Sequence, residues 1–249
     1  MIDTNAYLGS WPFNFTPDRT PARLVRHLAG HGIKRALVSH FDAVFQPEPM
    51  PANRRLFAAV KRTPQLVPVP IINLRLANWR EQLAECAAAR VCAVKLTPNF
   101  HNYTLADPVV AGFLSALVKA KLKLVINVRF EDERHRYFGL KIVGLPMADL
   151  KAFLQRHPGV HPLVTGICRP ELKELARSVK NFSADISYCE WHNTLADLLA
   201  ALPASRLMLG TCTPMLSTRG EVDKLRLANI PARAKTLIGS ANAAKFFKL

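Results

Sequence analysis

The sequence predicts an α/β fold, a (β/α)8 TIM barrel that forms one domain over residues 1–249. Eight short apolar runs of strand length alternate with longer amphipathic segments, which is the pattern of repeated βα units around a parallel sheet. The length of 249 residues lies within the range of one closed barrel. With 49% hydrophobic and 21% charged residues, the chain can bury a large core and does not have the composition of a disordered protein.

The strands are predicted at the apolar runs, since eight of them close a barrel. They fall at residues 2–8, 35–40, 66–73, 91–96, 122–128, 161–167, 182–188 and 207–211. Pro64, Pro68 and Pro70 crowd the third run. Because proline lacks the N–H that a strand donates, we expect a bulge or a short paired length there.

Amphipathic segments between the strands predict the crossover helices, with apolar residues three or four positions apart. They fall at residues 21–29, 109–120, 147–157, 170–179, 191–202 and 242–248. Asp107 is expected to cap the second of these, with Pro108 at its first position. The longest irregular pieces, residues 41–52 and 129–146, follow strand ends and so belong to the face where barrel active sites are built.

The charge balance is extreme, with 34 basic and 18 acidic residues and a formal net charge of +16. This basic protein is expected to have an anionic partner, such as a small carboxylate or phosphate substrate. The basic residues are scattered and form no zinc-finger or RNA-binding signature, so we do not expect nucleic acid as the partner.

The sequence also predicts the cellular location of the protein and the redox state of its cysteines. No apolar run approaches the roughly 18 residues of a membrane span, and the opening residues lack a secretory pattern, so we expect no membrane and a cytoplasmic protein. The five cysteines are widely spaced and odd in number, which argues for reduced thiols.

Two strand motifs resemble those of the amidohydrolase superfamily, in particular its amidohydrolase-related hydrolases and decarboxylases. The opening I-D-T-N-A-Y-L-G (residues 2–9) resembles the family's I-D-x-H-x-H-x-G, with Asn5 and Tyr7 in place of the histidines. The fourth strand, V-K-L-T-P (residues 94–98), is similar to its V-K-L-x-P.

Two further motifs follow in barrel order and carry the resemblance to the end of the chain. Residues 206–214 resemble the family's R-x-L-x-G-S-D-x-P, with Cys212 in place of the aspartate, and residues 239–247 resemble its terminal G-x-N-A-x-x-x-F helix. The resemblance implies a barrel whose mouth holds the substrate.

The family's metal ligands are the feature that this sequence lacks. In the family a divalent ion is held by the strand-one histidines, by histidines after strands five and six, and by the strand-eight aspartate. Here strand five ends with Asn127 and Arg129, and strand six with Cys168. We therefore expect no cofactor and a metal-independent site, with zinc held by Cys168, Cys189 and Cys212 as the alternative.

Four side chains are candidate catalytic residues. His40 ends strand two beside Asp42, and Lys95 lies on strand four, where an apolar wall would lower its pKa. Cys212 is a candidate nucleophile, and Glu131, in the charged loop after strand five, a candidate acid or base.

Each candidate has a structural alternative. The cysteines would be small buried residues, a lone histidine would be a hydrogen-bonded structural residue, and Lys95 would anchor Asp3 or Asp185. The charges of the loop at residues 129–136 would pair with one another at the surface.

The candidate substrate-binding residues surround the same mouth. Arg129 and Arg134 could clamp a carboxylate through parallel hydrogen bonds. The rest of this set lies at the ends of strands or in the loop after strand four: Asn5, Tyr7, His101, Asn127 and Asp185.

These observations predict a metal-independent hydrolase, or a related lyase, acting on a small anionic substrate at the mouth. The resemblance includes a precedent, since 2-pyrone-4,6-dicarboxylate lactonases open an anionic ring without a metal. The alternative is a catalytically inactive barrel, a pseudoenzyme that binds an anionic metabolite or a protein partner. Whether the chain forms a homo-oligomer stays open.

Overall fold

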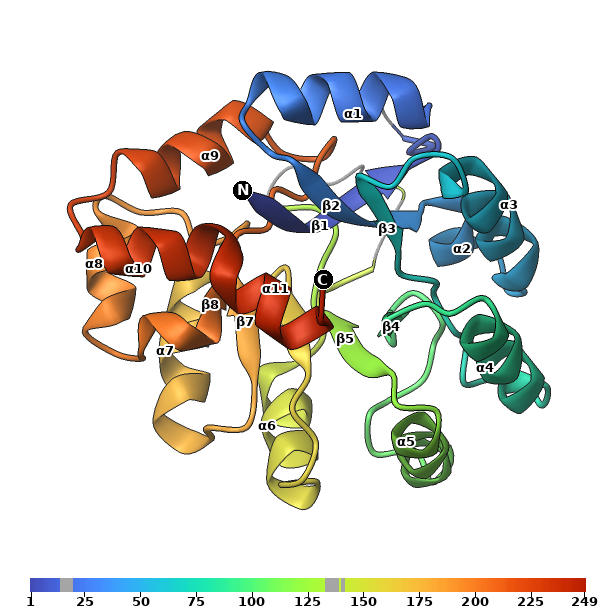
Figure 1. The fold of residues 1–249 in the computed structure, drawn as a ribbon. Helices are drawn as coiled ribbons and strands as arrows, with labels where there is room; N and C mark the ends of the chain where they lie inside the picture. Colours follow the sequence, from blue (N-terminus) through green and yellow to red (C-terminus); the bar gives the residue numbers. More distant parts are fainter. Residues whose placement is uncertain (14–19, 133–138, 140–141) are drawn as a thin grey trace.

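The chain folds as a (β/α)8 barrel of parallel strands, so the predicted fold class is confirmed (Figure 1). The computed structural model describes residues 1–13, 20–132, 139 and 142–249. Within them the strands are β1 (Ile2–Leu8), β2 (Arg35–His40), β3 (Leu66–Pro68), β4 (Ala93–Leu96), β5 (Lys123–Asn127), β6 (Leu163–Thr165), β7 (Ser183–Asp185) and β8 (Leu207–Met208). Each lies inside a predicted run.

Two seams close the barrel between the runs β1–β2–β3 and β4–β8. At the first seam Lys95 donates its backbone N–H to Pro70 (2.8 Å) and accepts from Ile72 (3.1 Å). At the second, Tyr7 donates to the carbonyl of Thr213 (2.8 Å). Single backbone bridges therefore take over where the regular ladders stop.

The proline-rich third strand is short, as predicted. β3 pairs with β2 over only three positions, from Leu66 to Pro68. Pro68 and Pro70 lack the N–H that would continue the ladder. The chain then reaches β4 through the isolated bridge between Ile71 and Lys95.

Helices surround the strands, and all six predicted helical segments contain one (Figure 1). They are α1 (Pro21–Gly30), α5 (Val109–Lys119), α6 (Met147–Arg156), α7 (Arg169–Ser178), α8 (Thr194–Leu199) and α11 (Asn242–Phe247). The structure adds α2 (Asp42–Phe45), α3 (Met50–Val60), α4 (Trp79–Ala88), α9 (Thr218–Arg226) and α10 (Ala232–Thr236), together with η1 (Ala204–Arg206) and the π-helical η2 (Leu237–Ala241). No helix among the described residues is both long and apolar enough to cross a membrane.

The predicted cap of α5 is wrong. The residue that precedes the helix is Pro108, and no side chain caps its first turn. The carboxylate of Asp107 instead accepts a hydrogen bond from the hydroxyl of Thr104 (2.9 Å). A short polar side chain in a turn can bond its local neighbours in this way rather than the helix.

The barrel interior is built in layers. The floor cluster joins residues in or next to the strands with two residues of α11, a helix that lies across one end of the barrel (Figure 1). Its buried members are Leu37, Val69, Ala93, Val125, Leu163, Met208, Ala243 and Phe247. Strand alternation places the residues two positions further along toward the mouth, and after Leu37, Ala93, Val125 and Leu163 these are the polar Ser39, Lys95, Asn127 and Thr165.

A glycine on the last strand makes room for this polar layer. A Cβ at Gly210 would collide with the carboxylate and the Cβ of Asp185. Gly166 has a similar role, since it adopts φ of +73° and a Cβ there would meet the backbone carbonyl of Arg129. Asp185 can be buried here only because residue 210 has no side chain.

We expect Gly210→Ala to lower the free energy of unfolding by about 1–3 kcal/mol, because the methyl group must displace Asp185 in a packed interior. Denaturant unfolding measures it. Gly159→Ala is the matched control, since a Cβ there meets open space. Equal stability of the two variants would show that the close approach at Gly210 is absent.

Candidate functional site

The candidate site is a polar layer between the floor cluster and the mouth of the barrel. It consists of Asn5, Tyr7, Lys95, Asn127 and Asp185, all at most 2% exposed. They come from β1, β4, β5 and β7. All five are candidate residues of the sequence analysis, and the structure brings them together inside the barrel, near its mouth.

A chain of hydrogen bonds links four of these side chains. The Lys95 ammonium donates to the Tyr7 hydroxyl (2.8 Å) and to the amide oxygen of Asn5 (3.1 Å). Tyr7 donates to the same amide oxygen (2.8 Å), and the Asn5 amide nitrogen donates to Asp185 (3.0 Å). The cation and the carboxylate are thus joined through an amide.

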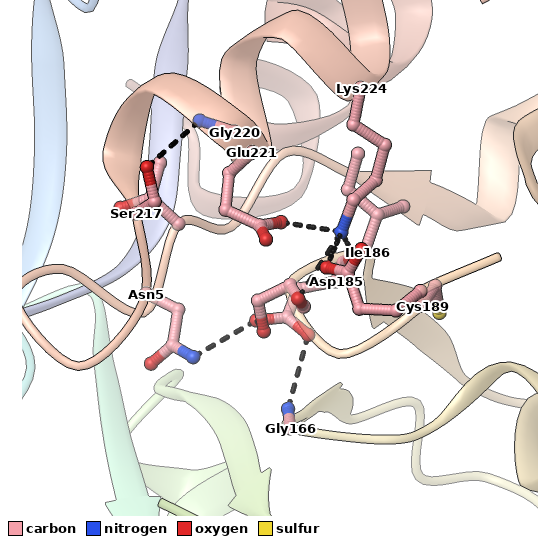
Figure 2. Close-up of polar contacts among 12 residues, drawn as sticks. Asn5, Gly166, Asp185, Ile186, Cys189, Ser217, Gly220, Glu221 and Lys224 are labelled. Carbon is pink, nitrogen blue, oxygen red and sulfur yellow. Dashed lines mark hydrogen bonds and ion pairs between the residues drawn. The ribbon is translucent and has the colours of Figure 1, made fainter. Parts of the chain in front are cut away.

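Asp185 is fully buried, and donors from three sides hold it. Figure 2 shows the donors Asn5 and Gly166, whose backbone N–H lies 3.1 Å from an oxygen of Asp185. The hydroxyl of Ser187 also donates to this carboxylate (3.0 Å). Burial raises the pKa of Asp185 to about 6, and these hydrogen bonds and Lys95 oppose the shift. The group is therefore mainly a carboxylate at neutral pH.

Lys95 is 2% exposed, and no carboxylate of the described residues lies within ion-pair distance of its ammonium. The Tyr7 ring lies 4.4 Å from the nitrogen. Burial lowers the pKa of Lys95 to about 8, while the charges of Asp185 and Asp3 act against the shift. Lys95 therefore anchors neither aspartate directly, which departs from the structural alternative considered for it.

Asn127 completes the layer and has hydrogen-bonding capacity left. Its amide nitrogen donates to the carbonyl of Arg129 (3.2 Å) and to the hydroxyl of Thr165 (3.2 Å). Its amide oxygen is buried and has no partner among the described residues. A buried acceptor without a donor is costly, so this oxygen is a place where a ligand donor would be favourable.

An aromatic group, the mouth cluster, packs over the polar layer. Its large members are Tyr7, Trp11, Phe41, Ile71, Phe130 and Tyr188, and Cys212 belongs to it. Tyr7 stacks on Phe41 with ring centroids 4.9 Å apart and meets Phe130 edge-on at 5.3 Å. The polar layer therefore faces ring surfaces, an environment that suits an aromatic ligand.

Both predicted histidines lie near the mouth but bond to other groups. His40 accepts the backbone N–H of Asp42 at Nδ1 (3.2 Å), and burial lowers its pKa. His101 bonds the carbonyl of Ala43 through Nε2 (3.1 Å), and burial lowers its pKa to about 4. His101 is therefore neutral at physiological pH and holds the segment that follows β2.

Glu131 lies at the rim of the mouth cluster. Its carboxylate accepts the indole N–H of Trp11 (2.7 Å), and burial raises its pKa. It thus bonds to the aromatic cover rather than to the polar layer.

Of the two arginines predicted to bind an anion, Arg129 and Arg134, the structure describes only Arg129. Arg129 forms two hydrogen bonds to the Glu171 carboxylate (2.7 and 2.6 Å) and one to the carbonyl of Gly166 (2.9 Å). Its guanidinium is therefore engaged by the chain itself. Arg134 lies outside the described residues.

The three cysteines after β6, β7 and β8 do not form a zinc site. The sulfur of Cys168 accepts from Arg129 (3.1 Å), and Cys189 donates to the carbonyl of Ile167 (3.5 Å). Burial raises the pKa of the Cys189 and Cys212 thiols well above the usual range, so both stay protonated at neutral pH. In the described part of the chain, no group of three His, Cys, Asp or Glu side chains could hold a metal ion.

Sequence reasoning missed a buried ion-pair group behind Asp185. The Lys224 ammonium on α9 contacts Glu221 (2.7 Å) and Glu190 (2.6 Å) and donates to the carbonyl of Ile186 (3.0 Å), as Figure 2 shows for Glu221 and Ile186. Burial acts to lower the Lys224 pKa, but the two carboxylates outweigh it and raise the pKa. Lys224 thus fixes the loop after β7 that supplies Ser187 to Asp185. The i, i+3 spacing of Glu221 and Lys224 was the available signal.

Comparison with solved structures finds similar barrels over nearly the whole chain. 5-Carboxyvanillate decarboxylase from Sphingomonas paucimobilis has a TM-score of 0.75 at 16% identity and covers 100% of this chain and 98% of its own. Dihydroxybenzoic acid decarboxylase from Polaromonas sp. JS666 has 0.77 at 16%, covering 100% and 96%. A probable 2-pyrone-4,6-dicarboxylic acid hydrolase from Acinetobacter baumannii has 0.70 at 12%, covering 100% and 99%. No protein-family model and no curated protein matches the chain.

The expectation of no cofactor is contradicted by these structures. The Polaromonas decarboxylase contains bound manganese, as does 5-carboxyvanillate decarboxylase from Novosphingobium aromaticivorans. The donors of the polar layer nevertheless do not fit such an ion. They offer the single carboxylate Asp185, which already accepts three hydrogen bonds, and they include the Lys95 ammonium, whose positive charge would repel a divalent ion.

At 12–16% identity the similarity establishes the fold. The chain is a (β/α)8 barrel with the same architecture as these decarboxylases and this probable hydrolase.

Proposed function

We propose that the protein is a lyase or hydrolase that acts on a small anionic aromatic acid at the mouth of the barrel, with decarboxylation as the favoured reaction. Two of the similar structures are, by name, decarboxylases of aromatic acids, and the third is a probable hydrolase of a cyclic dicarboxylic acid. The activity itself rests on the polar layer of this chain, because a fold does not determine a reaction.

The observation that carries the proposal is the buried ammonium of Lys95. Removing a charge from water costs several kcal/mol unless an opposite charge or good hydrogen bonds compensate for it. Here the groups in direct contact with it among the described residues are a phenol, its ring and an amide, while the carboxylates of Asp185 and Asp3 act on it from beyond ion-pair distance. A buried cation whose pKa is shifted is typical of a functional site.

An anionic substrate would supply the missing opposite charge. A carboxylate beside Lys95 would accept charge-assisted hydrogen bonds from the ammonium, and the Asn127 oxygen could accept from a substrate hydroxyl. The ring would lie against the mouth cluster. Because Lys95 is covered, substrate entry requires part of that cluster to move.

In the decarboxylation step the carbon–carbon bond between ring and carboxylate breaks and carbon dioxide leaves. The bonding electron pair stays on the ring carbon, which takes a proton from the Lys95 ammonium. The neutral amine regains its proton from solvent after release of the product. A pKa of about 8 suits this transfer, because a general acid works best when its pKa is near the ambient pH.

Lys95→Met is expected to lower turnover by about 100-fold or more, the usual contribution of a positioned proton donor. Its stability should be equal or higher, because methionine buries no charge. Carbon dioxide release from hydroxybenzoates and ring opening of 2-pyrone-4,6-dicarboxylate, each with and without added manganese, provide the assay. Lys119→Met, at an exposed position, is the control. Full activity of Lys95→Met would refute the proposal, and ligand binding without turnover by the native chain would favour the inactive barrel.

The pH profile gives an independent test. Lys95 is protonated below its pKa of about 8 and neutral above it. We therefore expect kcat/KM to fall as the pH rises through about 8, since both anion binding and proton donation are lost together. Steady-state rates between pH 6 and 10 measure this limb. A profile that stays flat to pH 10 would rule out Lys95 as the acid.

A further inference from the structure

A pocket lies at the opposite end of the barrel from the mouth. This base pocket has a volume of about 550 Å³ and lies beside α11, which crosses the barrel end near β5 and β8 (Figure 1). The residues that matter here are Lys123, His161, Ser183, Arg206, Lys245 and Phe246. They come from the first residues of β5 and β7, from the segments just before β6 and β8, and from α11, so only the closed barrel brings them together.

Three cations line the base pocket, and none forms an ion pair with a described residue. The Lys123 ammonium lies 5.1 Å from the centre of the Phe246 ring. Arg206 donates from Nε to the carbonyl of Phe182 (3.0 Å) and from Nη2 to that of Val179 (3.3 Å), which leaves Nη1 without a hydrogen bond to the described chain. The backbone thus fixes the guanidinium, which also lies over the Phe182 ring at 4.2 Å from its centroid, and no carboxylate of the described residues forms an ion pair with it.

His161 shows that these charges converge on one space. Its Nε2 is 3.0 Å from the hydroxyl of Ser183, and its ring lies 6.1 Å from that of Phe246. Burial lowers the pKa of His161, and the charges of Arg206 and Lys123 lower it further. Two cations on different elements therefore act on the same ring.

We propose that the base pocket binds a small organic dianion with an apolar body, such as an aryl phosphate or an aromatic dicarboxylate. The cations and the Ser183 hydroxyl provide donors for the anionic groups, and Met208, Leu237 and Phe246 provide an apolar wall. The volume lies within the range of about 300–1,000 Å³ of small-molecule sites. This binding is separate from the reaction proposed at the mouth.

Calorimetric titration of the full chain with phenyl phosphate at fixed salt tests the proposal. Lys123→Gln and Lys245→Gln should each weaken binding about tenfold, the effect of losing one charge-assisted contact, and Lys123→Arg should retain it. Arg233→Gln and Lys248→Gln, which remove exposed cations that do not line the pocket, should bind as the native chain does. Absence of binding, or equal weakening in all four glutamine variants, would overturn the proposal.

The Lys95→Met variant shows at which end of the barrel phenyl phosphate binds. Lys95→Met should bind phenyl phosphate with unchanged affinity; loss of binding there would place the ligand at the mouth and overturn the base pocket. Inorganic phosphate and phenol should each bind more weakly than phenyl phosphate. Equal affinity for inorganic phosphate would contradict the apolar wall as a recognition element.

Discussion

The ammonium of Lys95 inside the barrel is the charge on which the arrangement of the polar layer depends. It sits where water is excluded, so every neighbouring polar group is oriented by it: the Tyr7 oxygen and the Asn5 oxygen face it, and the Asn5 nitrogen faces Asp185 in turn. The interaction is strong because the surroundings are apolar, and for the same reason it is expensive to leave uncompensated. An anionic substrate is the simplest group that would complete this balance.

The backbone provides the precision that such a site requires. Lys95 lies at the seam between β3 and β4, where both of its backbone polar groups are bonded across the barrel. Asp185 fits because Gly210 leaves space beside it and because Gly166 turns its N–H toward it. Behind this first layer, Lys224 ties the loop after β7 to α9. Rigid strands and their supports hold the side chains more exactly than loops could.

Basic side chains lie in different surroundings at the two ends of the barrel. At the mouth a buried cation lies under aromatic rings, while at the base Lys123, Arg206 and Lys245 line an open pocket with an apolar wall. The similar decarboxylases contain manganese, whereas the polar layer of this chain carries an ammonium among its donors.

The sequence by itself determined the eight strands, the short third strand and the members of the polar layer, because apolar periodicity, proline and strand alternation are local properties of the chain. The resemblance of residues 2–9 to the I-D-x-H-x-H-x-G motif drew attention to Asn5 and Tyr7. Only the tertiary structure decided which partner each side chain takes. Arg129 pairs with Glu171, 42 residues further along, and the base pocket gathers residues at or just before four strands with others from α11. Such pairings depend on distances that exist only after the barrel closes, so no local pattern could predict them.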